Sequence, residues 1–317
     1  MKGLNSIIPI YAVSIVVLTV MIRVVMLPLD MRQRKNQAKM AELGPEIKSL
    51  QKRYKNNPQK LQFKQKELYR KAGYRPMMGC LPMLLQLPIF FAFFGAMRAL
   101  ASEQTVGLIL NAAQHGVDTV TLPQFLWVHN FWQPDSGLAH ILPDSMEFMS
   151  FLQTNANMIS PETLSLLRSF GLLDYSGQVM QVPEAAYNTI RQGILESAGL
   201  ENYNNGWFIL PALAGLGMFL QQKFSPQGQG GANPMMPVPA QPAADTPEAQ
   251  QAQGCSNKVM LWVMPIFSIY ICLQPTSNAA FALYWFTSSM YAFLQLRIIN
   301  LINRIKPKGN EIIVTNQ

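Results

Sequence analysis

One apolar run constrains this chain more than any other feature, because it is long enough to cross a bilayer and carries a full charge. Between Ser14 and Asp30 the only polar side chains are Thr19 and Arg23. An arginine at the centre of a membrane helix costs roughly 2.5–3.5 kcal/mol to insert. The run therefore predicts a membrane helix in which Arg23 has a task, and Thr19, four residues earlier, shares its helix face.

Composition extends this prediction to the whole chain, which we expect to be an all-α polytopic membrane protein. Hydrophobic residues make up 49% of the sequence and charged residues only 13%, against roughly 25% charged in soluble proteins. Apolar segments predict five transmembrane helices. The expected division is a first span in 1–29, a basic helical hairpin in 30–80, a second span in 81–101, an extracytoplasmic segment with a helical insert in 102–205, a third span in 206–224, a disordered linker in 225–257, two spans in 258–298 and a basic tail in 299–317.

The charges on either side of the predicted spans differ in sign. Residues 30–80 hold fourteen basic side chains against four acidic ones, whereas residues 102–204 hold ten acidic side chains against two arginines. Cytoplasmic loops of membrane proteins are enriched in lysine and arginine. This pattern predicts a cytoplasmic hairpin and tail, an extracytoplasmic N-terminus and insert, and a location in the bacterial plasma (inner) membrane.

Two loop regions have their own local patterns. In the hairpin, an apolar stripe of period 3.6 ends at Tyr54, and a turn signal at Lys55–Pro58 precedes a second stripe. The lysines on the other face suit anionic lipid headgroups, ribosomal RNA or simple solvation. In the insert, short helices are expected at Met146–Leu152, Pro161–Leu167 and Pro183–Leu195.

Polar side chains also interrupt the other predicted spans. Gln86, Gln222, Ser288 and Ser289 lie in otherwise apolar segments, and such groups usually face the interior of a bundle or water. Together with Arg23 they predict a wet cavity inside the membrane. None of the five predicted spans contains a carboxylate, which argues against an ion-coupled transporter.

Several chemistries are not indicated by the sequence. The three histidines do not fit a metal-ligand spacing, and the sequence holds neither a phosphate-binding loop nor a nucleophile–base pattern. We therefore expect no enzyme activity, no metal and no cofactor. A cationic, wet cavity suits the temporary holding of an extended polar peptide, because polar groups cost several kcal/mol to bury in oil.

Longer stretches of the sequence resemble the YidC-type membrane-protein insertases, a family that includes mitochondrial and thylakoid relatives. The resemblance rests on a basic run and several apolar runs. These are IRVVMLPLDMRQRKNQAKMAELGPEIKSLQKRYKNNPQKLQFKQKELYRKAGYRP, GCLPMLLQLPIFFAFF, FLWVHNFW, ILPALAGLGMFLQQKFSP, NKVMLWVMPIFSIY and FALYWFTSSMYAFLQLRI.

The resemblance implies five helices around a groove that opens to the cytoplasm and to lipid. Arg23 takes the position of the groove arginine, and Gln86, Gln222 and Trp285 match further groove positions. The implied function is insertion and chaperoning of nascent membrane proteins. The implied partners are these substrates, the ribosome at the hairpin and tail, the Sec translocon and anionic lipids, but not DNA. A small-solute transporter or channel subunit is the alternative function.

Overall fold

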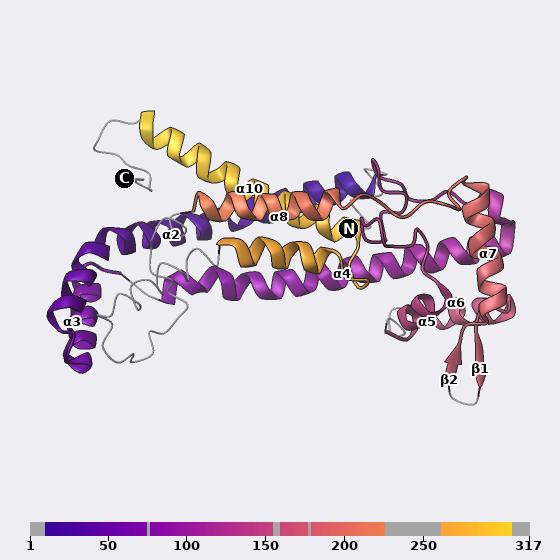
Figure 1. The fold of residues 1–317 in the computed structure, drawn as a ribbon, viewed down its shortest axis with the longest axis horizontal. Coiled ribbons are helices and arrows are strands. Elements are labelled where there is room, and N and C mark those ends of the chain that lie inside the picture. The colour runs from indigo at the N-terminus through magenta and orange to yellow at the C-terminus, as the bar shows by residue number, and fades with distance from the viewer. Residues whose placement is uncertain (1–9, 75–76, 155–158, 177–178, 226–260, 306–317) are drawn as a thin grey trace. The chain divides into compact units, whose positions relative to one another are not determined.

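The computed structural model describes residues 10–74, 77–154, 159–176, 179–225 and 261–305, and it is mostly helical (Figure 1). The chain forms two compact units. Unit 1 comprises Met1–Phe90, Ala214–Ser268 and Trp285–Gln317, and unit 2 comprises Phe91–Leu213 and Ile269–Tyr284. Nearly all of the predicted linker and most of the predicted tail lie outside the described residues.

The first helix of unit 1, α2 (Tyr11–Arg53), joins the first predicted span and the first half of the hairpin without a break. Its part Tyr11–Asn36 has a mean hydropathy of 2.4 and, among the described residues, is the helix long and apolar enough to cross a membrane. The part of the chain that the structure describes thus has one candidate span by length and composition. Helices also cover the other predicted spans, but their membrane crossing stays a prediction.

The basic hairpin of unit 1 turns where the sequence signals place the turn. Helix α3 (Pro58–Lys71) begins with proline, and the side chain of Asn57 caps it by accepting a hydrogen bond from the Lys60 amide at 3.0 Å. Gly73 ends it at a φ of +62°, a conformation that glycine adopts without strain. Apolar side chains hold α3 against α2, namely Leu43, Ile47, Leu68, Tyr69, Ala72 and Tyr74.

Further helices contribute to unit 1, namely the first part of α4 (Met77–His115), the C-terminal parts of α8 (Ile209–Lys223) and α10 (Ala279–Ile305), and the first part of the helix Leu261–Cys272. Helices α8 and α10 approach closely at Gly217, where an added Cβ would lie 3.3 Å from Ser289 Cβ. The rings of Phe219 and Trp262, 5.0 Å apart, join α8 to the helix Leu261–Cys272.

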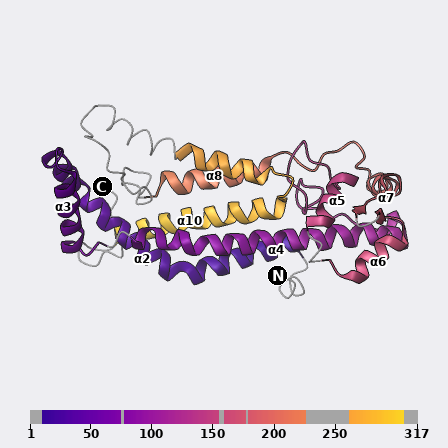
Figure 2. The same cartoon turned by 90° about the horizontal axis from the view of Figure 1, so that it is seen from below.

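Unit 2 contains the end of α4 (Met77–His115) and the insert that follows it. The insert holds η1 (Val117–Thr119), α5 (Ser145–Thr154), α6 (Pro161–Ser169) and α7 (Glu184–Ser197). Each of the three insert helices overlaps one of the apolar patches in the sequence. Figures 1 and 2 show α5, α6 and α7 beside the last turns of α4.

Helix α4 continues to His115, beyond the predicted end of the second span at Ala101. The extension has buried side chains on one face, Val106, Ile109 and Ala112, and these belong to the same core as the insert. In that core the ring of Phe148 stacks on Tyr187 at 4.7 Å, and the Tyr187 hydroxyl donates to the Pro143 carbonyl at 2.8 Å. Burial raises the pKa of Tyr187. The end of α4 is therefore a platform for the insert.

One small sheet departs from the all-α prediction. Strands β1 (Asp174–Ser176) and β2 (Val179–Gln181) pair antiparallel, with Tyr175 opposite Met180. Met180 and the nearby Val182 pack against the insert core. The insert is therefore helical with a short β-hairpin rather than wholly helical.

Candidate functional site

The arginine of the apolar helix is partly buried in unit 1 and faces α10. Its Nε donates to the hydroxyl oxygen of Ser288 at 3.0 Å, and one of its terminal nitrogens donates to the same oxygen. Ser288 is itself buried. Among the described residues, hydrogen bonds join Arg23 to Ser288 and to none of the other predicted site residues. The structure thus brings together two of the six predicted site residues.

Thr19 lies one turn before Arg23 and is buried, but its hydroxyl is used within its own helix. The Oγ1 atom donates to the carbonyl of Ile15 at 2.7 Å. This back-bonding is a common way for threonine to satisfy its hydroxyl inside an apolar helix. Thr19 therefore contributes a buried polar position on α2, with its proton directed at the backbone.

The remaining predicted site residues lie on other helices. Trp285, near the start of the unit 1 part of α10, meets Phe90 edge to face with ring centroids 5.6 Å apart. Gln222 lies half-buried in the last turn of α8. Gln86 lies on α4, but its side chain falls outside the described residues. The structure therefore places Trp285 and Gln222 in unit 1 without joining either to Arg23.

A cationic and aromatic cluster occupies the ends of α8 and α10, and sequence reasoning missed it. The guanidinium of Arg297 lies 4.3 Å from the ring centroid of Phe224 and 5.5 Å from that of Phe293. The ammonium of Lys223 lies 5.6 Å from the ring of Phe219. Such contacts contribute roughly 0.5–1 kcal/mol each at exposed sites. The signal in the sequence was the aromatic residue four positions before each cation.

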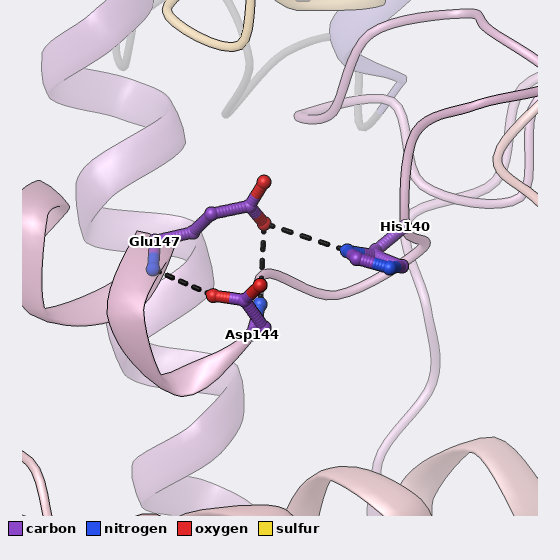
Figure 3. A group of neighbouring side chains, drawn as sticks. All are labelled: His140, Asp144 and Glu147. Carbon is purple, nitrogen blue, oxygen red and sulfur yellow. Dashed lines mark hydrogen bonds and ion pairs between the residues drawn. The ribbon is translucent and has the colours of Figure 1, made fainter.

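A second constellation, in unit 2, groups His140, Asp144 and Glu147 (Figure 3), whose ligand-type atoms lie within 4.8 Å of one another. Asp144 Oδ1 accepts from the Glu147 amide at 2.7 Å, and Glu147 Oε2 accepts from the Asp144 amide at 3.2 Å. This reciprocal pair is a capping box at the start of α5. Helix capping therefore accounts for both carboxylates, and the Asp-x-x-Glu spacing would have predicted it.

A cavity of about 470 Å³ lies beside this group in unit 2. His140, Arg191, Glu196, Glu201 and Tyr203 are among its lining residues. The Nε of Arg191 donates to the Leu142 carbonyl at 3.1 Å, which fixes the arginine at the wall. The lining carries both signs of charge and many amide groups, which is typical of a hydrated surface pocket.

A buried carboxylate ties the start of α8 to the loop that follows α4. Asp135 is fully buried and accepts hydrogen bonds from Trp127 Nε1 at 3.0 Å, from the Trp207 amide at 2.8 Å and from the Leu210 amide at 2.7 Å. Gly206 is required beside it, because an added Cβ would collide with the carboxylate. We call Asp135 and these three donors the junction.

A second set of hydrogen bonds closes the base of the insert next to the junction. Asn204 Nδ2 donates to the Gly137 carbonyl at 2.6 Å, and the Asn205 amide donates to Ala139 at 3.0 Å. The Asn205 side chain is buried and bonds to Asn130 and Pro134. These bonds therefore join residues 130–139 to residues 204–205 at the base of the insert.

A strongly apolar helix with a half-buried arginine, continuous with a basic hairpin, defines a helical membrane protein. The family model described as 60Kd inner membrane protein matches residues 3–172. The chain belongs to this family, which confirms the resemblance found in the sequence. The matched residues include Thr19, Arg23 and Gln86, whereas Gln222, Trp285 and Ser288 lie beyond them.

Curated relatives agree with the family match. The chain is similar to "Membrane protein insertase YidC" of Clostridium perfringens, with 39% identity over 143 residues, 45% of this chain and 53% of the relative. The protein of the same name from Treponema denticola is 46% identical over 95 residues, 30% of this chain and 16% of the relative. That from Campylobacter jejuni is 35% identical over 151 residues, 48% of this chain and 25% of the relative. The matches thus span about half the length of these relatives or less.

Proposed function

We propose that this chain is a membrane-protein insertase and chaperone. It receives hydrophilic segments of nascent membrane proteins in a positively charged groove within the membrane and releases apolar segments into lipid. The observation that carries the proposal is the pairing of Arg23, within a candidate span, with the neutral hydroxyl of Ser288. The names of the relatives support it.

The chemistry of this pair suits a transient anionic or peptidic ligand. A guanidinium has five N–H donors in a planar fork, and a serine hydroxyl oxygen can accept only two hydrogen bonds. Ser288 therefore orients Arg23 without neutralising its charge. Acidic side chains and backbone carbonyls of an incoming segment are the acceptors that Arg23 favours, because charge-assisted hydrogen bonds are about twice as strong as neutral ones.

Further residues complete the proposed groove. Thr19 lies one turn from Arg23 on the same helix, and Gln222 and Trp285 lie on α8 and α10 in the same unit. Gln86 is assigned to the groove from the resemblance alone. Polar groups from several helices would keep such a groove hydrated, and a hydrated groove shortens the apolar distance that a polar tail must cross.

The proposed topology has five spans with the N-terminus outside and the C-terminus in the cytoplasm of a bacterial cell. The basic hairpin and tail then face the cytoplasm, and the insert lies outside. The hairpin is proposed to meet the ribosome and anionic lipids, because most of its lysines and arginines have no acid at helical spacing. The Sec translocon is a further proposed partner. The activity needs neither catalysis nor a cofactor.

The alternative, a small-solute transporter or channel subunit, makes a different prediction about access. A transporter or channel requires a path that opens on both sides of the membrane, whereas an insertase groove opens to the cytoplasm and to lipid. Thiol reagents applied from each side to cysteines placed at Thr19 and Arg23 distinguish the two. Labelling from the outside would favour the alternative.

The decisive experiment is insertion of a single-span substrate into liposomes that hold only this protein. Wild type, Arg23→Ala and Arg23→Lys are compared on substrates with acidic and neutral translocated tails. Losing charge-assisted bonds worth about 1.5–3 kcal/mol should lower insertion of the acidic substrate roughly tenfold to a hundredfold in Arg23→Ala. Arg23→Lys keeps the charge and should largely retain insertion.

Matched controls test whether the effect belongs to this site. Arg98 on α4 lies 5.8 Å from the ring of Phe94, and Arg98→Ala removes a helical cation without touching the proposed groove. Photocrosslinkers at Gln222 and Trp285 should capture the substrate, and one at the exposed Val25 should not. Equal insertion by wild type and Arg23→Ala, with no capture at either groove position, would contradict the proposal.

A further inference from the structure

Three large apolar side chains project from the backbone around the junction in unit 2. Leu126 is 73% exposed, Leu138 is 85% exposed and Trp207 is 71% exposed. Each lies within three residues of a group that bonds to Asp135 or of Asp135 itself. We call Leu126, Leu138 and Trp207 the apolar rim. Soluble surfaces expose single apolar side chains commonly, but three on one rigid framework need an explanation.

Tight turns precede or carry the two leucines, and the turn at Leu126 is of a kind that water-facing loops usually build from other residues. Phe125 and Val128 exchange backbone hydrogen bonds of 2.9 Å, so Leu126 and Trp127 form the tip of a tight turn. Leu126 has a φ of +54° there, where glycine, asparagine or aspartate is usual. Leu138 follows a turn in which its amide bonds to Ser136 Oγ.

Trp207, the third member of the apolar rim, also has its backbone fixed by a hydrogen bond. The Trp207 amide bonds to Asp135, and the next residue, Phe208, has a φ of +63°. Phe208 packs its ring against Gly137, where an added Cβ would lie 3.0 Å from the ring. Two apolar residues thus adopt a backbone conformation that is unfavourable for them, and such outliers point to function.

The scarcity of charged residues around the apolar rim indicates what kind of environment this surface contacts. In residues 119–138 the only Asp, Glu, Lys or Arg is Asp135, which is buried. A water-facing segment of this length would be expected to carry several charges. Apart from Asp135, the polar side-chain groups present are amides, hydroxyls, indole nitrogens and the imidazole of His129. This combination is typical of the boundary between headgroups and acyl chains, where tryptophan is enriched.

We infer that the apolar rim inserts into the headgroup–acyl boundary of the outer leaflet and fixes the depth of the start of α8. The inference rests on the topology in the proposed function, which places residues 102–205 outside. Three hydrogen bonds to the buried Asp135 carboxylate make the framework rigid, so the rim and the first turn of α8 move together. Lipid contact at the rim therefore sets how far α8 can slide along the membrane normal.

Spin labels on the full-length protein in liposomes of phosphatidylethanolamine and phosphatidylglycerol test the inference. Leu126→Cys, Leu138→Cys and Trp207→Cys are made in a background with Cys80, Cys255 and Cys272 replaced by alanine. Relaxation by oxygen, which concentrates in lipid, is compared with relaxation by a water-soluble nickel chelate. At each rim position we expect an oxygen-to-nickel accessibility ratio severalfold above that of Met146→Cys. Met146 is 74% exposed on α5 but lies between charged residues.

Two results would overturn the inference. Nickel accessibility equal to that at Met146 would show that the rim faces water, and low accessibility to both reagents would show that protein covers it. A label at Val25, on the candidate span, separates this failure from that of the proposed function. If Val25 contacts lipid and the rim does not, only the rim assignment falls; if Val25 faces water, the membrane topology falls with it.

Discussion

Arg23 on α2 and Ser288 on α10 are 265 residues apart in the chain, and the guanidinium donates two hydrogen bonds to the one hydroxyl oxygen. This pair fixes the rotation of α2 about its own axis, because Arg23 is the one charged side chain in the apolar run 14–29. Apolar side chains alone specify such a rotation weakly in lipid, because lipid tails are as apolar as leucine. Ser288 is therefore both a packing residue and an orienting residue.

Replacing Ser288 with alanine should destabilise the contact between α2 and α10. The variant leaves the part-buried guanidinium without its acceptor, and hydrogen bonds to charged groups contribute about 1.5–3 kcal/mol. Thermal unfolding of the purified protein in detergent measures the loss. Ser289→Ala is the control, since it keeps the Cβ that packs toward Gly217. Equal midpoints for the two variants would mean that the bond contributes little.

Enlarging Gly217 should separate α8 from α10. An added Cβ at this glycine would lie 3.3 Å from Ser289 Cβ and 3.5 Å from the Phe286 ring, so Gly217→Leu overpacks the contact by about 1–3 kcal/mol. At Gly95 on α4 an added Cβ meets open space, and Gly95→Leu should be tolerated. A disulfide-crosslinking yield between α8 and α10 reports their separation. Unchanged yield in Gly217→Leu would contradict the close approach.

Substituting Asp135 with asparagine should loosen the junction. The amide keeps the shape but replaces one acceptor oxygen with a donor, so at least one of the three N–H groups that bond to the carboxylate loses its partner, at about 1–3 kcal/mol. Hydrogen exchange of the Trp207 and Leu210 amides should accelerate roughly tenfold or more. Asp174→Asn, at an exposed site, should leave both amides unchanged. Protection that survives in Asp135→Asn would refute the role of the carboxylate.

The hairpin should respond to acid through Glu67. Hydrogen bonds from Lys64 at 2.7 Å and ion pairing with Lys71 at 2.9 Å lower the pKa of Glu67 from 4.5 to about 2. Because the folded-state pKa is lowered, the stabilisation is present above pH 4.5 and is lost as the pH falls from 4.5 through 2. Carbon-13 titration of the Glu67 carboxyl in the full-length protein measures this midpoint.

A Glu67→Gln variant is the control for this pH dependence. Its hairpin should lack the pH dependence, and at neutral pH it should show faster amide exchange in α3 than wild type. Well below pH 2 the two proteins should converge, because the wild-type carboxyl is half protonated near pH 2 and becomes fully protonated only below it. A titration midpoint near 4.5 in wild type would show that the two ion pairs do not persist in solution.

Local chemistry made the helices and the hairpin turn predictable from the sequence. Asn57 followed by Pro58 forms an N-cap and a first helical residue whatever lies around it, and Gly73 ends α3 by its own backbone freedom. The strands β1 and β2 were missed because three residues are too few to show an alternation. The Asp144–Glu147 capping box follows from the Asp-x-x-Glu spacing at the start of α5.

Tertiary relationships were beyond sequence reasoning for a different reason. Arg23 and Ser288 could each be named as polar residues in apolar segments, but their pairing depends on how two distant helices pack. The extension of α4 to His115 was hidden because Ser102, Glu103 and Gln104 interrupt the apolar run. The buried face of this extension cannot be recognised from its own residues, because the insert contributes the other half of the core that covers it. Asp135 gave no local sign that it would bond to Leu210.

The unbroken course of α2 has a mechanical consequence. Arg23 and the hairpin turn at Tyr54 lie on one continuous helix, and the thirty-one residue steps from one to the other measure roughly 46 Å at 1.5 Å per residue. A partner that binds the hairpin is therefore connected through α2 to the guanidinium of Arg23. Torque or tilt applied at the hairpin is transmitted along α2 to Arg23, damped where Pro28 and Pro45 interrupt the backbone hydrogen bonds.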